Sequence, residues 1–370
     1  MDITPWWAHQ LGSVGQAGRE GEEGPAGLRS IGETRSPRGL GSYTGEPRPR
    51  NVPPVSAESP VPQSAAVPAC APSRAALSRQ IHRLAGLGQA PWLHQEVARR
   101  LAEKLDPIRL EPQSWIDWSA HLGAGAEIVQ AKYPKAQRWV IEPHAALADR
   151  SRAAAQDARR GWKTWFKRPQ EQVFAEPVAA APWLPGGVQM LWANMTLHAA
   201  DNLPEMMAQW HRHLAIDGFL MCSGLGPDTA RELRGVYREM GWALPTIDFI
   251  DMHDLGDELV KAGFADPVMD METLTLTWAS PEALLEELRT WGGNVAAGRF
   301  DGLRTPRWRE RLLEALSRRL MRSDGRLGLT VELVYGHAIK PIPKAKLGPE
   351  TKVSLDDMRA MIRRDSPKSN

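Results

Sequence analysis

The chain has 370 residues, of which 42% are apolar and 24% are charged, and its formal net charge is +2. This composition is typical of one or two globular domains, and so small a net charge excludes a strong field that would attract nucleic acid or an anionic membrane. The two cysteines, Cys70 and Cys222, exclude a disulfide scaffold and a four-cysteine zinc site.

The first segment, residues 1–72, contains 11 Pro and 10 Gly and shows no apolar periodicity. Such a segment buries too little apolar surface to offset its ordering entropy, so we interpret it as disordered. Alternatively, translation starts downstream of it. The first residues lack the basic and apolar regions of a secretory signal, and the chain lacks a run of about 18 apolar residues. We therefore expect a cytoplasmic protein, with a flexible, charged tail over residues 346–370.

Apolar periodicity then predicts alternating helices and strands. Helical spacing extends over 74–104, followed by a strand at 115–118, a helix at 127–132, a strand at 139–142, a helix at 144–160, strands at 172–176 and 188–193, a helix at 203–214 and a strand at 219–222. Glycine 218 marks the break between the last two. Strands that alternate with helices of this length predict βαβ units and a parallel sheet.

The C-terminal third has a different pattern. Residues 269–278 and 329–339 alternate between apolar and polar, which predicts two strands, and helical spacing recurs at 281–291 and 307–321. Two late strands are typical of an antiparallel addition to a parallel sheet. We predict one α/β domain over 73–345, with a helical insertion at about 279–326.

Polar residues follow the predicted strands. In an open parallel sheet, ligands bind beyond the carboxyl ends of the strands, and here those ends carry Asp117, Glu142, Glu176 and Asn194. An acid after the second strand, Glu142, is placed to accept hydrogen bonds from a ribose diol. The alternative is a surface acid that caps the helix after Pro143.

The loop after the first strand gives a weak signal. It contains Gly123 and Gly125, but Ile128 stands where a dinucleotide-binding Gly-x-Gly-x-x-Gly motif needs its third glycine. Glycines in such a loop let the backbone approach a ligand closely.

Two histidine motifs resemble metal or acid–base sites. We interpret Asp251-x-His253-Asp254 as a helix start with Asp254 as the N-cap. His211 and His213 are two residues apart on a predicted helix and do not share a face, so we predict no metal site there.

Longer stretches of the chain resemble a known family. Residues 115–147 resemble the first βαβ unit of class I S-adenosylmethionine (SAM)-dependent methyltransferases. More specific similarity lies in Leu191–His198, Gly224–Arg234, Phe249–Asp257, Ala262–Asp270 and Val334–Ala338. Over about residues 74–342, the chain is similar to the BioC family, the malonyl-acyl-carrier-protein O-methyltransferases of biotin biosynthesis.

This resemblance implies a Rossmann-like, doubly wound sheet that is mostly parallel with an antiparallel late strand. It implies methyl transfer from SAM to the free carboxylate of a malonyl group on acyl carrier protein. That carboxylate is already ionised at pH 7, so no catalytic base is predicted. The resemblance places Glu142 at the ribose hydroxyls and Glu176 near the adenine, and the implied donor pocket comprises Asp117, Ser119, His121, Gly123, Glu142, Glu176 and Asn194.

The chain also departs from the family pattern. The loop's three glycine positions hold Ser119, His121 and Gly123, and Leu84 stands where an early tyrosine usually closes over the donor. The side chain of His121 could fill space that SAM needs. Trp118, in the same loop, is a candidate aromatic face for the sulfonium cation or a core residue.

The substituted loop keeps two other functions open. One is a non-catalytic protein that has kept the fold and a binding surface. The other is a protein-modifying hydroxylase, because an arginine-hydroxylating complex I assembly factor is similar to this family.

A basic segment is the candidate partner surface. Residues 299–326 contain nine Arg and four acidic residues. Arginine suits carboxylates geometrically, so Arg318, Arg319 and Arg322 are candidates for docking an acidic carrier or holding the malonyl carboxylate. The alternative is a solvated helix face.

Overall fold

A computed structural model describes residues 71–160, 172–175, 186–343 and 355–356. The predictions for residues 1–70, and for the tail apart from 355–356, lie outside the described residues. Within the described residues, no helix combines the length and apolar character needed to cross a bilayer.

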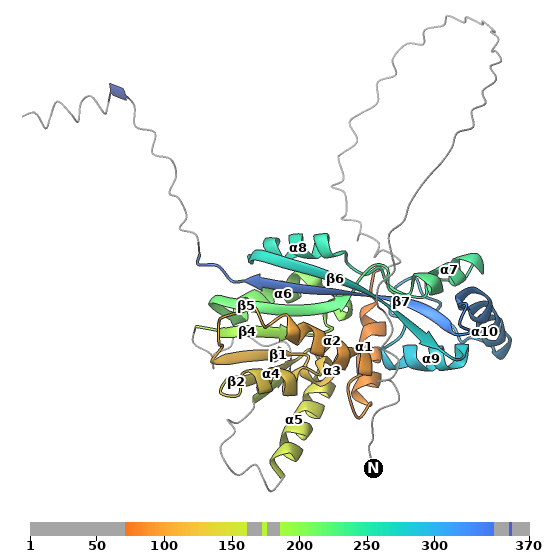
Figure 1. The fold of residues 1–370 in the computed structure, drawn as a ribbon, viewed down its shortest axis with the longest axis horizontal. Helices are drawn as coiled ribbons and strands as arrows, with labels where there is room; N and C mark the ends of the chain where they lie inside the picture. Colours follow the sequence, from red (N-terminus) through yellow and green to blue (C-terminus); the bar gives the residue numbers. More distant parts are fainter. Residues whose placement is uncertain (1–70, 161–171, 176–185, 344–354, 357–370) are drawn as a thin grey trace, which may run out of the picture. The chain divides into compact units, whose positions relative to one another are not determined.

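Seven strands form one sheet in the order β3-β2-β1-β4-β5-β7-β6 (Figure 1). Their bounds are β1 (Ser114–Trp118), β2 (Gln137–Glu142), β3 (Gln172–Ala175), β4 (Val188–Ala193), β5 (Leu214–Leu225), β6 (Ala265–Trp278) and β7 (Leu327–Ile339). The first five strands pair in parallel, whereas β7 is antiparallel to both β5 and β6. The predicted Rossmann-like, mostly parallel sheet with an antiparallel late strand is confirmed.

The helices follow the predicted alternation with three differences. They are α1 (Arg74–Ala85), α2 (Trp92–Glu103), α3 (Ala120–Gly123), α4 (Ala126–Lys132), α5 (Ala145–Arg160), α6 (Leu203–His213), α7 (Arg231–Glu239), α8 (Met252–Lys261), α9 (Pro281–Thr290) and α10 (Pro306–Leu320). The stretch 74–104 is two helices, because Gly86, Gly88 and Pro91 interrupt it. Helices α3 and α7 were not predicted.

The N-cap of α8 is Asp251, so the prediction of Asp254 is wrong. The Asp251 backbone is extended, and its carboxylate accepts a hydrogen bond from the backbone N–H of His253. Asp254 lies within the first turn of the helix.

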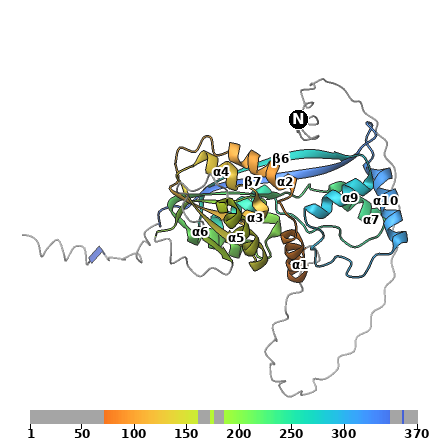
Figure 2. The ribbon, with the colours of Figure 1, turned by 90° about the horizontal axis from the view of Figure 1, so that it is seen from below.

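Helices cover both faces of the sheet, and Figure 2 shows α2 and α4 on one side with α5 and α6 on the other. Side chains of α2 pack with Trp115 and Trp192 in one core cluster. Trp118 and Trp139 belong to the cluster on the opposite face, with side chains of α6 and α8. The tryptophans of the predicted strands are therefore core residues.

The long strands β6 and β7 extend beyond the parallel sheet, and α7, α9 and α10 gather around that end (Figure 1). Leu327 and Leu329 of β7 pack there in a separate cluster with Leu284 of α9 and Leu316 of α10. The helical addition thus has its own small core on an extension of the same sheet.

Helix α1 connects the two regions. Near its N-terminus, the backbone N–H of Ser73 donates to the carbonyl of Val295 over 2.7 Å, and Leu77 packs with Ile247. At its other end, Leu84 packs with Leu122 and Leu147 beside the parallel sheet. One face of α1 is therefore shared between the sheet and the helical addition.

Gly125, at the start of α4, is required by packing. An added Cβ would collide with the indole of Trp192, although the Gly125 backbone itself is in the ordinary right-handed region. Gly125→Ala should lower the free energy of unfolding by about 1–3 kcal/mol, as overpacking of a core does. Urea denaturation measures this, with Gly88→Ala as the control because no atom lies within 4 Å of its added Cβ. Equal stability of the two variants would contradict the prediction.

Candidate functional site

The site lies where the chain reverses its direction across the sheet. Strand β2 pairs with β1, and β3 pairs with β2 further toward that edge of the sheet. The chain then returns, and β4 pairs with the other side of β1. Ligands of open α/β sheets bind at such a switch point, beyond the carboxyl ends of the strands. Ser119 follows β1 and Asn194 follows β4, so these two predicted site residues border this point.

Asn194 is the centre of a buried hydrogen-bond network. Its Nδ2 donates to the backbone carbonyls of His94 over 2.8 Å and Gly123 over 2.6 Å. Its Oδ1 accepts from the Ser223 hydroxyl over 2.7 Å, and that hydroxyl accepts from the backbone N–H of Met195 over 2.9 Å. Asn194 therefore joins β4 to α2, α3 and β5, and its side chain is saturated by the protein.

Glu142 is fully buried at the end of β2. Its Oε1 accepts from the backbone N–H of His121 over 2.8 Å and from the Ser151 hydroxyl over 2.5 Å. Its Oε2 is buried and has no hydrogen-bond partner among the described residues. Burial raises the pKa of Glu142 to about 7. The alternative of a surface capping acid is wrong, since Glu142 is buried. Like Asp117, it lines neither cavity described below.

Asp117 is held by a strand neighbour. It is fully buried, and its Oδ2 accepts from the Arg138 guanidinium of β2, 2.7 Å from Nη2 and 3.1 Å from Nε. The carboxylate is thus part of an ion pair between β1 and β2, and Asp117 lines neither cavity described below.

The loop after β1 makes a tight turn although Ser119 and His121 occupy two of the three glycine positions of the family. Ser119 has φ +59° and Ala124 has φ +55°, in the left-handed region that costs a side-chain-bearing residue about 1 kcal/mol or more. The Ser119 N–H donates to the carbonyl of Ile141 over 2.8 Å, which fixes the turn against β2. The His121 ring faces the backbone of Leu87 and lines neither cavity.

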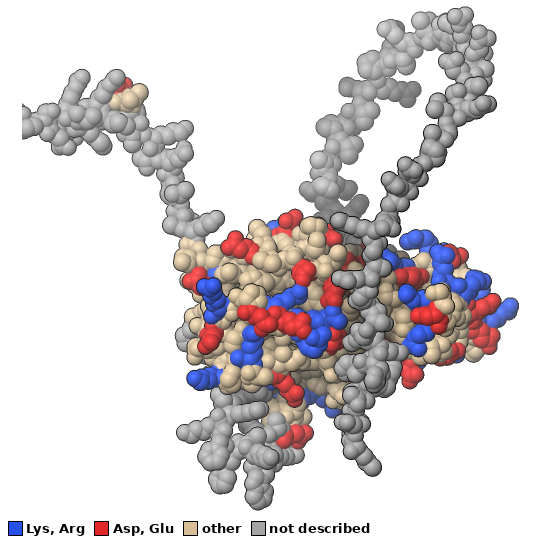
Figure 3. All heavy atoms as spheres, viewed as in Figure 1, with Lys and Arg blue, Asp and Glu red and all other residues tan. Residues whose placement is uncertain are grey.

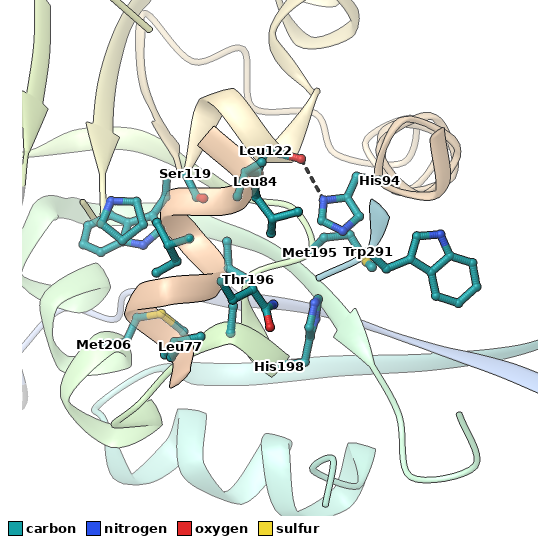
Figure 4. A pocket seen from close by; sticks show the side chains of 15 residues that line it. Leu77, Leu84, His94, Ser119, Leu122, Met195, Thr196, His198, Met206 and Trp291 are labelled. Atoms are coloured by element: carbon teal, nitrogen blue, oxygen red, sulfur yellow. Dashed lines mark hydrogen bonds between the residues drawn. The ribbon is translucent and has the colours of Figure 1, made fainter. Parts of the chain in front are cut away.

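A small cavity of about 60 Å³ lies at the switch point (Figure 4). Helix α1 forms one wall, and the segments after β1 and β4 form the other. The walls include Leu77, Gln80, Ile81, Leu84, Trp118, Ser119, Met195, Thr196 and His198. Ligand pockets measure roughly 300–1,000 Å³, so this cavity is smaller than a nucleoside-sized ligand needs. Leu84 is among the side chains that line it, and its role toward a donor stays a prediction.

Trp118 is a core residue that also borders the small cavity. It is 1% exposed and packs edge-on against Trp210, with ring centroids 6.1 Å apart. Its interpretation as a core residue is confirmed, and its ring also borders the small cavity.

Two histidines meet at the small cavity, and neither was predicted as a site residue. His94 Nδ1 donates to the Leu122 carbonyl over 2.8 Å (Figure 4). His94 Nε2 and His198 Nδ1 are buried without a hydrogen-bond partner in the described part of the chain. Burial lowers the pKa of His94 to about 4 and that of His198 to about 3, so both rings are neutral at pH 7. Single histidines without a spacing partner give no sequence signal.

A large cavity of about 680 Å³ adjoins the small one. It lies among α1, α7, α9, α10 and the segment before α8. Gln80, His198 and Trp291 line both cavities, so the two meet at these side chains. No sequence pattern predicts this cavity, because its walls come from segments far apart in the chain.

The predicted arginines lie elsewhere. Arg318, Arg319 and Arg322 are exposed, at or just beyond the C-terminal end of α10, and line neither cavity. Arg319 pairs with Glu239 of α7 over 3.0 Å. Figure 3 shows Lys and Arg interspersed with Asp and Glu over α7 and α10. Glu176 lies outside the described residues, so its role stays a prediction.

The curated relatives that the chain matches share one name. The chain is 36% identical over 260 residues to malonyl-[acyl-carrier protein] O-methyltransferase of Gallionella capsiferriformans, covering 70% of this chain and 88% of that protein. It is 38% identical over 277 residues to the protein of the same name from Laribacter hongkongensis, covering 74% and 89%. Among solved structures, the YcgJ protein of Bacillus subtilis covers 67% of this chain and 99% of its own, with 10% identity and a TM-score of 0.45. No family model matches the chain.

Asn194→Ala should destabilise the protein by about 3 kcal/mol or more, because it leaves two buried carbonyls and a buried hydroxyl without their partner. Urea denaturation gives the change in unfolding free energy. Asn202→Ala is the comparison, since Asn202 is exposed and only caps α6, which is worth about 1 kcal/mol. A loss in Asn194→Ala no greater than in Asn202→Ala would contradict the network's role.

The buried Glu142 predicts a pH-dependent stability. Its pKa is about 7 when folded and about 4.5 when unfolded, so its stabilising neutral form is fully present below pH 4.5. As the pH rises from 4.5 to 7, the wild type should lose about 3 kcal/mol relative to Glu142→Gln, which does not titrate. Urea denaturation at several pH values checks this, and parallel pH profiles for the two proteins would disprove it.

Proposed function

The chain belongs to the malonyl-[acyl-carrier protein] O-methyltransferase family, and from this we propose that it methylates the free carboxylate of a malonyl thioester on acyl carrier protein. The methyl donor is SAM, and the reaction serves biotin biosynthesis. We also propose that the chain works in the cytoplasm, where malonyl thioesters on carrier proteins are made and used.

The similarity to relatives over nearly nine-tenths of their length carries this proposal. At the switch point the donor would need more room than the small cavity of about 60 Å³ offers, and the following residues would surround it. The unpartnered Oε2 of Glu142 would accept a ribose hydroxyl of SAM at the end of β2. Ser119 and Trp118 would border the rest of the donor in the small cavity. His121 and Gly123 would hold the loop beneath it, and Asp117 and Asn194 would act through the elements they join.

The proposed methyl transfer requires that the two substrates be positioned correctly, and it requires no catalytic base. When bound, SAM supplies a methyl group on a cationic sulfur. A carboxylate oxygen forms a bond to the methyl carbon while the carbon–sulfur bond breaks and sulfur keeps the electron pair, so no proton moves. In-line placement of oxygen, carbon and sulfur supplies most of the acceleration. The neutral histidines His94 and His198 leave the carboxylate's charge and reactivity intact.

We propose that Arg318, Arg319 and Arg322 dock the acidic carrier protein. Helix α10 contributes Arg309 to the large cavity and Arg318 to the outer surface, about 14 Å apart along its axis. A carrier bound at that outer surface would have the cavity within reach of its acyl group.

SAM binding tests the donor site. Titration calorimetry should detect SAM binding to the wild type, and Glu142→Gln should weaken it about tenfold, because a hydrogen bond to a carboxylate is lost. Glu205→Gln is the matched control, because Glu205 is exposed on α6. Absence of binding at millimolar SAM would overturn the proposal and favour a non-catalytic binding protein.

Methyl transfer tests the acceptor. Radiolabelled SAM should deliver one methyl group to malonyl carrier protein as an ester and none to acetyl carrier protein, which lacks the carboxylate. Reversing Arg318 and Arg319 to Glu should weaken carrier binding, and unchanged affinity would refute the docking surface. SAM binding without methylation of malonyl carrier protein would point to another acceptor.

A further inference from the structure

The large cavity carries a concentrated positive charge. Its lining includes Arg83, Arg289, Arg304 and Arg309 and, among the described residues, no Asp or Glu. In the described part of the chain, none of these four arginines forms an ion pair with a carboxylate. Unpaired arginines around a cavity favour an anionic ligand, because a guanidinium binds carboxylates and phosphates with two parallel hydrogen bonds.

The cavity has a near end at the donor site. Gln80, His198 and Trp291 belong to both cavities. Arg83 lies one helical turn after Gln80 on α1, and its Nη2 is 2.9 Å from the position that a Cβ would take on Gly293. Gly292 and Gly293 have φ of +137° and +144°, which favours glycine, so the backbone after α9 leaves room for Gln80 and Arg83. Arg83 is thus close to the residues that the two cavities share.

Two arginines at the start of α10, Arg304 and Arg309, line the large cavity but not the small one, and we call this region the far end. The Arg304 guanidinium lies 3.8 Å from the centroid of the Phe300 ring and 4.4 Å from that of Trp308. Such stacking holds the guanidinium in place while leaving its N–H groups able to bind an anion. Arg309 lines the same region one residue after Trp308.

The remaining lining is mostly apolar, with isolated hydrogen-bonding groups. Leu233, Tyr237 and Phe249 contribute apolar surface. Thr246 Oγ1 and Trp308 Nε1 are buried without a hydrogen-bond partner in the described part of the chain. Buried polar groups are nearly always paired, so these two atoms indicate that a ligand with amide groups completes them.

We propose that the large cavity binds the acyl-thioester arm of the acceptor, with Arg83 pairing with the free carboxylate at the donor end and Arg304 and Arg309 pairing with the phosphodiester that joins the arm to its carrier. The arm has a carboxylate at one end, amides in its middle and a phosphate at the other end, and the cavity lining offers arginines for the two anionic groups and hydrogen-bonding side chains for the amides. This inference rests on the proposed function and assigns the residues that recognise its substrate.

Direct binding of the full chain to malonyl and acetyl carrier protein separates the two roles. Wild type should bind the malonyl form more tightly, because the acetyl form lacks the carboxylate. Arg83→Gln should weaken malonyl binding about tenfold, leave acetyl binding within about twofold and so abolish the preference. Arg304→Gln and Arg309→Gln should each weaken both forms to a similar extent, and Arg83→Lys should restore part of the preference.

The matched controls are Arg79→Gln on α1 and Arg307→Gln on α10, because both arginines are exposed and line neither cavity. SAM affinity should stay within about twofold in every variant, which shows that each remains folded. A malonyl preference that survives Arg83→Gln, or undiminished binding in Arg304→Gln and Arg309→Gln, would overturn the inference while the proposed function stands. A wild type that neither binds SAM nor methylates the malonyl form would instead overturn the proposed function.

Discussion

The side chain of Asn194 is the interaction on which the rest of the site depends. One buried amide fixes the positions of α2, α3 and β5 relative to the end of β4. Such a network is strong in a low-dielectric interior only when every member is satisfied, and both ends of the Asn194 amide are. His94, Leu122 and Met195 project from the elements that it joins, so the geometry of the small cavity depends on it. A polar residue at a strand end can therefore shape a cavity without lining it.

The loop after β1 shows how a motif can change while its geometry persists. A glycine there would reach φ +59° without cost, whereas Ser119 occupies the same region at some expense in stability. The turn places the backbone N–H of His121 within hydrogen-bond distance of the Glu142 carboxylate. This contact comes from the backbone, so it requires no particular side chain at residues 119 and 121. The loss of two glycines therefore leaves the acid at the end of β2 correctly supported.

Much of the fold could be predicted because apolar periodicity reports directly on burial. The strands at 139–142 and 188–193 and the helices flanking them were found within a few residues. Gly218 was interpreted as a break, yet it lies inside β5, where a Cβ would stand 2.9 Å from the Ala215 carbonyl oxygen. The strand-end residues Glu142 and Asn194 were found from topology, whereas their hydrogen-bond partners were not. Cavity walls built by α1 and Trp291 join segments about 200 residues apart, which no local pattern records.

Helix α1 is a common wall, since Gln80 lines both cavities, Leu84 faces the small one and Arg83 the large one. A wall shared by two ligands cannot be displaced for one without altering the space and the charge presented to the other. Donor and acceptor occupancy are then thermodynamically linked, and by reciprocity each ligand changes the affinity for its neighbour by the same factor. With donor and acceptor in the two cavities as proposed, the position of this one helix would couple the binding of one substrate to that of the other.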